Sequence, residues 1–392
     1  MKALTWQGRQ HVEVSEVPDP VVQEPTDAIV RVTSTAICGS DLHLYDVLTP
    51  YMKPGDVLGH EVIGIVEEVG AAIDRIGPGD RVVVPFNIAC GSCWMCQHSL
   101  QSQCETTQMH RTGKGAKLFG YSSLYGAVPG GQAEYLRVPQ AQYGPVIVPA
   151  NRPDERYLYL SDILPTAWQA VQYADARADD CIAVIGLGPV GQLACRVALH
   201  LGARVIGVDL VADRLQTASQ HGVEVIDMRS VDDVPRAVHD LTDGRGADGV
   251  VDAVGMEAHG SKFAGAATDV ASRLPAAMGR PVMERFGLDR MDALHTALAA
   301  VRRGGTVSIS GVYGGRIDPL PMVELFDKGI TIRMGQANVR RWTDELLTLV
   351  SDDDVFDLEH LATHHLPLSE GPDAYRMFRD KDDRCLKVVL QP

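Results

Sequence analysis

The pattern of hydrophobic positions changes about 160 residues into the chain. Before that point, short apolar runs at 28–32, 62–69 and 81–85 end at turns such as G-P-G-D at 77–80 and P-G-G at 129–131. Such runs between glycine and proline turns are typical of β-strands. From about Ser161 onward, alanine-rich stretches of helical length alternate with strand-like runs. That alternation predicts an α/β chain in which a parallel sheet with crossover helices follows a β-rich part.

The same patterns predict a β-rich domain over 1–160 and a domain boundary near Ser161, after which the α/β part begins. One stretch interrupts the alternation, because residues 256–289 are rich in Ala, Gly, Met and Pro without a clear period. A single crossover helix needs fewer residues than lie between Gly255 and the next turn at Gly304. Residues 256–289 are therefore interpreted as an insertion.

Composition and charge exclude several classes of function. Of the 392 residues, 45% are hydrophobic and 22% are charged, as in folded globular proteins. The formal net charge of -15 disfavours binding to nucleic acids or anionic membranes. No apolar run approaches the roughly 18 residues of a membrane span, and the first residues lack the apolar core of a signal peptide. We therefore expect a cytoplasmic protein with eight reduced cysteines.

Four of these cysteines lie close together in the sequence. Cys90, Cys93, Cys96 and Cys104 have the spacing C-x2-C-x2-C-x7-C. Four thiolates from one short lobe can surround a tetrahedral Zn²⁺, and this saturated ligand set leaves no open position for a substrate. The spacing predicts a structural zinc site; an iron–sulfur cluster, or free or disulfide-paired cysteines, are the alternatives.

A second group of possible metal ligands lies upstream of this lobe. Cys38 begins the segment C-G-S-D-L-H at 38–43, and His60 stands in G-H-E at 59–61. Both residue types bind zinc, although a single Cys or His is more often an ordinary core residue. The glycines at 59, 64 and 70 complete the pattern G-H-E-x2-G-x5-G. With this pattern and the cysteine lobe, the chain resembles the zinc-containing medium-chain alcohol dehydrogenases.

The resemblance implies a GroES-like, β-rich catalytic domain followed by a doubly wound Rossmann cofactor domain over 161–339, with residues 340–392 returning to the catalytic domain. It also implies roles for individual residues. Cys38 and His60 would bind the catalytic zinc. Ser40 would carry the substrate proton, and His43 would pass it toward solvent.

Three further residues receive roles from the same resemblance. Asp41 would orient the metal-binding imidazole of His60 from behind. Glu61 would lie just behind the metal. Phe86 would form an aromatic wall of the substrate pocket, with an ordinary core position as the alternative.

The third protein ligand departs from much of the family, which often has a Cys or Glu near the domain junction. No cysteine lies between Cys104 and Cys181, but Asp162 stands in S-D-I-L-P-T at 161–166. A carboxylate can bind zinc, which would give Cys, His and Asp plus one open position; a helix N-cap is the alternative role. Together with G-G-Q-A-E-Y at 130–135, this arrangement resembles the glutathione-independent formaldehyde dehydrogenase branch.

A dinucleotide-binding pattern opens the second domain. A strand at Cys181–Ile185 leads into G-L-G-P-V-G at 186–191, a helix at 192–201 and a second strand that ends in Asp209. Gly186, Gly188 and Gly191 would let a pyrophosphate approach the helix N-terminus. Asp209 would accept hydrogen bonds from the ribose hydroxyls and repel a 2′-phosphate, so NAD(H) is expected rather than NADP(H).

Other cofactor contacts follow from the resemblance. Thr166 and Val190 would lie beside the nicotinamide, and the backbone of Ser310 and Val312 would contact its carboxamide. Lys387 would lie near the pyrophosphate, or would be a surface strand residue.

These residues together predict hydride transfer between a small alcohol or aldehyde and NAD(H), with two zinc ions per subunit. The resemblance implies a homodimer or homotetramer. The rival enzymatic hypothesis is aldehyde dismutation with tightly bound NAD(H). In the formaldehyde dehydrogenase branch an extra loop at the position of 256–289 covers the adenine end of the cofactor; a surface loop or subunit contact is the alternative. A nucleotide-sensing subunit without catalysis is the hypothesis from another class.

Overall fold

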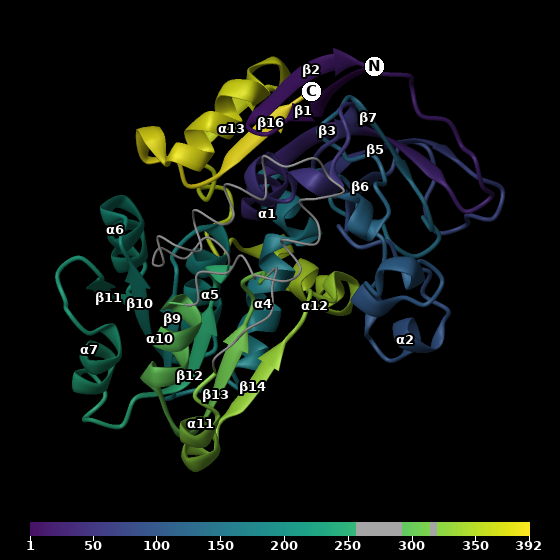
Figure 1. Cartoon of the computed structure of the whole chain (residues 1–392). Coiled ribbons are helices and arrows are strands. Elements are labelled where there is room, and N and C mark those ends of the chain that lie inside the picture. The colour runs from purple at the N-terminus through teal and green to yellow at the C-terminus, as the bar shows by residue number, and fades with distance from the viewer. Residues whose placement is uncertain (256–291, 314–319) are drawn as a thin grey trace. The chain divides into compact units, whose positions relative to one another are not determined.

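A computed structural model describes residues 1–255, 292–313 and 320–392 (Figure 1). The chain forms two compact units, one built from Met1–Pro165 and Ala337–Pro392 and the other from Thr166–Gln336. The first unit therefore takes its residues from both ends of the chain. The predicted insertion at 256–289 lies outside the described residues.

The first unit consists mainly of β-strands joined by short helices. Its strands are β1 (Lys2–Gly8), β2 (His11–Glu16), β3 (Ala28–Ile37), β4 (Asp56–Val57), β5 (Glu61–Val69), β6 (Arg81–Val84), β7 (Tyr135–Val138), β8 (Val146–Ile147), β15 (His364–Pro367) and β16 (Val388–Gln391). Its helices are α1 (Gly39–Leu42), α2 (Trp94–Gln97), α3 (Glu155–Leu158), α12 (Val339–Asp352) and α13 (Gly371–Asp380). Helix α4 (Ile163–Tyr173) begins in this unit and continues into the second.

The main sheet of the first unit has the strand order β15-β16-β3-β5-β6-β8, with β7 also paired to β3. Its core is made by alternate residues of neighbouring strands, such as Val30 and Val32 of β3 and Val62 of β5. Arg31, between the two buried valines, is exposed. This alternation is what a sheet with one buried face requires, and it explains the short apolar runs of the sequence.

Strand register brings three distant segments to one edge of this sheet. Strands β3 and β5 are antiparallel with Ala36 opposite Glu61, and β16 is antiparallel to β3 with Val388 opposite Ile37. The residue after β3, the residue before β5 and the residue before β16 are Cys38, His60 and Lys387. They are therefore neighbours in space although they lie far apart in sequence.

The second unit alternates strands and helices. Its strands are β9 (Cys181–Ile185), β10 (Arg204–Asp209), β11 (Glu224–Asp227), β12 (Ala247–Asp252), β13 (Val301–Ile309) and β14 (Thr331–Met334). Its helices, besides most of α4, are α5 (Pro189–His200), α6 (Ala212–Gln220), α7 (Val234–Asp240), α10 (Asp292–Ala300) and α11 (Met322–Lys328).

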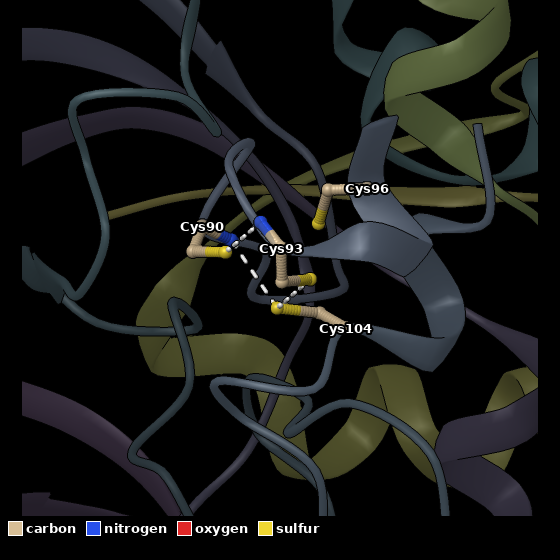
Figure 2. A group of neighbouring side chains, drawn as sticks. All are labelled: Cys90, Cys93, Cys96 and Cys104. Atoms are coloured by element: carbon tan, nitrogen blue, oxygen red, sulfur yellow. Dashed lines mark hydrogen bonds between the residues drawn. The ribbon is translucent and has the colours of Figure 1, made fainter. Parts of the chain in front are cut away.

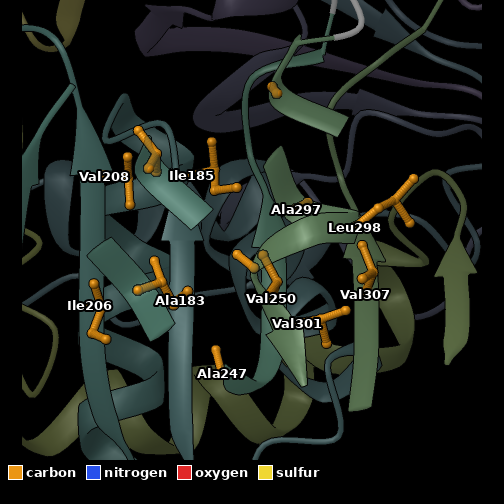
Figure 3. Packing of buried hydrophobic residues seen from close by; sticks show 14 of the residues in the cluster. Ala183, Ile185, Ile206, Val208, Ala247, Val250, Ala297, Leu298, Val301 and Val307 are labelled. Atoms are coloured by element: carbon orange, nitrogen blue, oxygen red, sulfur yellow. The ribbon is translucent and has the colours of Figure 1, made fainter. Parts of the chain in front are cut away.

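The sheet of this unit is parallel throughout, in the order β11-β10-β9-β12-β13-β14. Strand order reverses beside β9, which is the topology of a doubly wound dinucleotide-binding fold. Figure 3 shows side chains of β9, β10, β12 and β13 packed with Ala297 and Leu298 of α10. Strands covered on both faces need continuous apolar runs, which is why C-I-A-V-I of β9 is buried at every position.

Candidate metal centres and cofactor site

The first candidate centre contains the thiol of Cys38, the imidazole of His60 and the carboxylates of Glu61 and Asp162. One ligand atom from each lies within 4.8 Å of all the others, and all four residues are buried. Asp162 enters from the turn before α4, where the carbonyl oxygen of Ser161 accepts a hydrogen bond from the backbone N–H of Phe86. The predicted ligands are thus brought together by the sheet edge and by this turn.

The spacing of the three predicted ligands fits a tetrahedral zinc ion. With bonds of about 2.3 Å to sulfur and about 2.0–2.2 Å to nitrogen and oxygen, tetrahedral ligands lie about 3.4–3.6 Å apart. Asp162 Oδ2 lies 3.5 Å from Cys38 Sγ and 3.2 Å from His60 Nε2. Sulfur, nitrogen and oxygen donors at these separations can hold zinc with a fourth position left for substrate oxygen.

Charges and burial at this centre favour the protonated forms of Cys38 and His60. Burial, with the negative charge of Asp162 added to it, raises the pKa of Cys38 to about 11. Burial disfavours the charged form of His60, but the carboxylates of Asp41 and Asp162 outweigh it and raise the pKa of the imidazole. Metal binding would have to displace these protons.

Ser40 and Asp41 contact opposite sides of the His60 ring. Ser40 Oγ lies 3.1 Å from Nε2, on the side of the other two ligands. Asp41 Oδ1 lies 3.1 Å from Nδ1, at contact distance but outside the alignment of a full hydrogen bond. His43 is buried at the start of the helical segment His43–Val47 that follows α1. Ser40 and Asp41 are thus neighbours of the imidazole, and the proton path through Ser40 and His43 stays a prediction.

Glu61 and Lys387 form a completely buried ion pair. Lys387 Nζ donates to Glu61 Oε1 at 2.5 Å and to the carbonyl oxygen of Ile37 at 2.9 Å, and the exposed fraction of Lys387 is 0%. Burial disfavours its ammonium, but the carboxylate of Glu61 outweighs this and raises the pKa of Lys387. This arrangement corrects one expectation, because the amine is not part of the surface. Its position near a cofactor pyrophosphate stays a prediction.

Two aromatic side chains lie at this centre. The ring of Phe86 meets that of His60 edge-on, with 6.1 Å between centroids. Tyr121, which the sequence did not single out, follows Gly120, where a Cβ atom would lie 2.2 Å from the carbonyl oxygen of Gly59. Burial raises the pKa of the Tyr121 hydroxyl. The backbone before Tyr121 is thus packed against the residue before His60.

The second candidate centre is the lobe with Cys90, Cys93, Cys96 and Cys104, whose side chains converge in Figure 2. The sulfur atoms of Cys93 and Cys104 lie 3.9 Å apart, close to the roughly 3.8 Å between thiolates of a tetrahedral zinc site. All eight cysteines of the chain are free of disulfides. The lobe therefore offers four sulfur ligands and no open position.

Hydrogen bonds in the lobe favour the thiolate forms of Cys90 and Cys104. Burial opposes charge on Cys90, but bonds from the hydroxyl of Thr106 at 3.1 Å and from Ser92 outweigh it and lower its pKa. Cys96 and Cys104 share a proton, which lowers the pKa of Cys104 to about 4 and raises that of Cys96. The lobe is prepared for a cation that replaces the remaining protons.

Comparison with known proteins identifies the family. Residues 24–149 match the alcohol dehydrogenase GroES-like domain, and residues 189–268 match the zinc-binding dehydrogenase domain. An uncharacterized zinc-type alcohol dehydrogenase-like protein of Bacillus subtilis is 42% identical over 396 residues, covering 100% of both chains. The chain belongs to the zinc-type alcohol dehydrogenase family. Zinc and NAD(H) are its cofactors, as the sequence predicted.

Other members of this dehydrogenase family are similar along the whole chain. An alcohol dehydrogenase from Thermus sp. ATN1 has a TM-score of 0.83 at 36% identity, with 100% of this chain and 99% of that chain covered. A glutathione-independent formaldehyde dehydrogenase of Pseudomonas aeruginosa is 31% identical, with coverage of 96% and 94%. A formaldehyde dismutase of Pseudomonas putida is 30% identical, with coverage of 100% and 97%. The predicted family and its GroES-like and Rossmann folds are confirmed.

The second unit of the protein carries the glycine-rich turn between β9 and α5. Gly186 has a positive φ of 87°, and Gly188 is the N-cap of α5, which begins at Pro189 and contains Val190. A Cβ atom on Gly191 would lie 1.8 Å from the carbonyl oxygen of Gly186. The backbone therefore requires glycine at 186 and 191, and the turn leads into the N-terminus of α5, where an anion would bind.

Asp209 holds this turn as well as ending β10. Its carboxylate accepts hydrogen bonds from the backbone N–H groups of Leu187 at 2.6 Å, Leu210 at 2.6 Å and Val211 at 2.8 Å. The sequence pattern predicted an acid at this place for ribose recognition but not its bonds to the turn. Asp209 thus connects the two loops at the carboxyl ends of β9 and β10.

The remaining predicted cofactor residues lie at different places in the second unit. Ser310 follows β13, and its N–H donates to the carbonyl oxygen of Asp252 at 3.0 Å. Val312 is exposed, and Thr166 lies on α4. A Cβ atom on Gly311 would lie 2.2 Å from the backbone nitrogen of Gly255, so the ends of β12 and β13 are tightly packed together. Contacts of these residues with NAD(H) stay predictions.

We expect Gly191→Ala to weaken NAD(H) binding at least about tenfold, because the new methyl group would force the 186–191 turn apart. Overpacking of this kind costs about 1–3 kcal/mol. The dissociation constant for NADH is measured by fluorescence titration. Gly77→Ala is the control, since a Cβ atom there meets nothing within 4 Å; unchanged NADH binding in Gly191→Ala would contradict the assigned role of this turn.

No helix in the parts of the chain that the structure describes is long and apolar enough to cross a membrane. This agrees with the absence of a long apolar run in the sequence.

Proposed function

We propose that the protein is a zinc-dependent dehydrogenase that transfers hydride between an alcohol or aldehyde and NAD(H). The observation that carries the proposal is the convergence of Cys38, His60 and Asp162, with Asp162 Oδ2 3.5 Å from the thiol and 3.2 Å from the imidazole, in a chain whose second unit has the dinucleotide-binding turn. When bound, zinc lowers the pKa of a substrate hydroxyl and NAD⁺ accepts the hydride. The substrate class rests on the family and on this ligand set.

The chain's own residues would then hold the metal and move the proton. Cys38, His60 and Asp162 leave one tetrahedral position for the substrate oxygen. Ser40 lies on that side of His60, at 3.1 Å from Nε2, and is the group we infer to accept the substrate proton. His43, buried in the next helical turn, would pass the proton on. Phe86 would limit the space beside the reacting carbon.

A screen of small alcohols with NAD⁺ and of aldehydes with NADH, followed at the nicotinamide absorbance, tests this proposal. We expect turnover with at least one pair, lost on removal of zinc by a chelator and restored by added Zn²⁺. Absence of turnover with every pair, in protein shown to hold two zinc ions, would contradict it. Parallel assays with NADP⁺ and NADPH test the expected preference for NAD(H).

Aldehyde dismutation is the second candidate, favoured by the 30% identity to a formaldehyde dismutase over the whole chain. A dismutase oxidises one aldehyde and reduces another, so its NAD(H) is regenerated without leaving the protein. The experiment removes free cofactor by gel filtration and measures formaldehyde consumption with and without added NAD⁺. Full activity without added cofactor favours dismutation, whereas strict dependence on NAD⁺ favours the dehydrogenase.

A nucleotide-sensing subunit without catalysis is less well supported. Such a protein needs no open metal site, yet Cys38, His60 and Asp162 are placed at zinc-binding distances with Ser40 beside them. One zinc ion per chain rather than two, together with normal NADH binding, would favour this hypothesis.

We infer that two copies pair through the edge strand β14. All four residues of β14 are exposed, including Ile332 and Met334, and the adjacent helix α11 exposes Val323 (82%) and Phe326 (90%). An exposed apolar edge with unpaired backbone groups invites another strand, and antiparallel pairing with the same strand of a second copy would satisfy both. We expect Phe326→Glu to lower the mass of the assembly in light scattering; an unchanged mass would contradict this interface.

We also propose a cytoplasmic location. Eight free cysteines and a four-thiol metal lobe suit a reducing compartment, because oxidation to disulfides would remove the metal ligands.

A further inference from the structure

Asp41 is held by a side chain from a distant segment. Gln132, whose exposed fraction is 0%, donates from Nε2 to Asp41 Oδ2 at 3.2 Å and to the carbonyl oxygen of Ala36 at 3.2 Å. Its Oε1 accepts a hydrogen bond from the hydroxyl of Tyr375 at 2.8 Å. The amide of Gln132 therefore has a partner at both ends, and it joins Tyr375 on α13 to the carboxylate behind His60.

The contacts of Asp41 show what this amide stabilises. Asp41 Oδ2 accepts from the backbone N–H of Cys38 at 3.0 Å as well as from Gln132. Its Oδ1 and the Nδ1 atom of His60 lie 3.1 Å apart, and neither has a hydrogen-bond partner in the described part of the chain. Asp41 thus contacts both of the proposed ligands that flank the sheet edge.

Donor and acceptor chemistry fixes the orientation of the Gln132 amide between Asp41 and Tyr375. A carboxylate only accepts hydrogen bonds, so the NH2 group of Gln132 faces Asp41 and its carbonyl oxygen faces Tyr375. The hydroxyl of Tyr375 must then be the donor. At the other end, Asp41 Oδ1 favours a proton on His60 Nδ1, which leaves the lone pair of Nε2 for the metal.

Close packing holds the side chains of Gln132 and Tyr375 in these positions. A Cβ atom on Gly59 would lie 2.3 Å from Cγ of Gln132, so the glutamine packs directly on the residue before His60. The ring of Tyr375 lies 5.3 Å from that of Tyr45, centroid to centroid, and the guanidinium carbon of Arg379 lies 5.8 Å from the centroid of Tyr45. The hydroxyl of Tyr375 therefore has little freedom to leave Gln132.

We propose that Gln132 and Tyr375 are positioning residues that fix Asp41 and, through it, the tautomer and orientation of His60 for metal binding. We call these two residues the Asp41 brace. The inference rests on the metal site of the proposed function but not on its substrate. It predicts that removing the brace weakens metal binding at this centre and leaves the cysteine lobe unaffected.

The test measures how fast the zinc-loaded protein gives up its metal to the chromogenic chelator 4-(2-pyridylazo)resorcinol. Tyr375→Phe removes one hydroxyl and keeps the ring. Changes in groups that orient metal ligands cost about 10–100-fold in metal affinity, so we expect zinc release from one of the two sites to accelerate about tenfold. The zinc of the cysteine lobe is the internal control, and its release should be unchanged.

Tyr157→Phe is the matched control variant. Tyr157 is fully buried in the same unit, and its hydroxyl has no hydrogen-bond partner among the described residues. We expect it to release both zinc ions at the parent rates. Cobalt-substituted protein gives a second readout, since the visible ligand-field bands should shift in Tyr375→Phe and not in Tyr157→Phe.

Two results would overturn the brace. One is release from both sites of Tyr375→Phe at the rates of Tyr157→Phe, with identical cobalt spectra. The other is equal acceleration at both sites, which would mean a general loss of stability. If Tyr375→Phe fails to fold, Gln132→Leu is judged by the same criteria. Zinc release needs no substrate, so failure of the brace is distinguishable from failure of the proposed alcohol oxidation.

Discussion

Replacing Asp162 with alanine should remove one of two zinc ions and lower kcat/KM for alcohol oxidation by more than about 100-fold. The carboxylate is one of three predicted protein donors, 3.5 Å from the thiol of Cys38 and 3.2 Å from the imidazole of His60. Changes in groups that only orient ligands cost about 10–100-fold, and loss of a direct ligand should exceed that. Elemental analysis and steady-state kinetics on the same preparation give both quantities.

The matched variant for this experiment is Asp162→Cys. A thiolate is a zinc ligand of the kind that much of the family has at this junction, so Asp162→Cys should keep two zinc ions and part of the activity. If Asp162→Ala retains full zinc content and normal turnover, the carboxylate is not a ligand. Its place before α4 would then be explained by helix capping.

Cys104→Ser should remove the other zinc ion and lower the free energy of unfolding by several kcal/mol. The thiol of Cys104 is completely buried among the other lobe cysteines. Structural zinc typically binds with an apparent free energy of about 10–16 kcal/mol, which stabilises the folded lobe. We expect zinc content to fall from two to one, the urea midpoint to decrease, and proteolysis to begin within the lobe.

Cys385→Ala provides the comparison for that prediction. Cys385 is a buried thiol of the same unit outside both metal centres, so its loss should cost about 1 kcal/mol and no zinc. Two zinc ions per chain in Cys104→Ser, with an unchanged urea midpoint, would show that the lobe does not hold metal.

The features that the sequence predicted well are local in the chain. The spacing of Cys90 to Cys104 places four thiols in one short lobe, and the turn at 186–191 has backbone geometry that requires its glycines. Both patterns carry their chemistry within a few residues. The doubly wound fold was equally accessible, because strands buried on both faces must be apolar throughout.

Contacts that depend on strand register and on distant segments were not accessible in the same way. Lys387 pairs with Glu61 across 326 residues, and Tyr375 reaches Gln132 across 243. A lysine near the chain end has no local signal for burial, so its ion pair with Glu61 could not be predicted from the sequence. Gln132 stood in a motif used for the resemblance, but only the packing of its side chain on Gly59 indicates its contact with Asp41.

Stepwise removal of zinc separates the two metal centres by their effect on turnover. We expect purified protein to hold two zinc ions per chain, a chelator to remove one of them first, and NAD-dependent turnover to disappear with that ion and to return when Zn²⁺ is added. Full turnover after loss of that ion, or a single zinc ion per fully active chain, would contradict the assignment of a catalytic zinc to Cys38, His60 and Asp162.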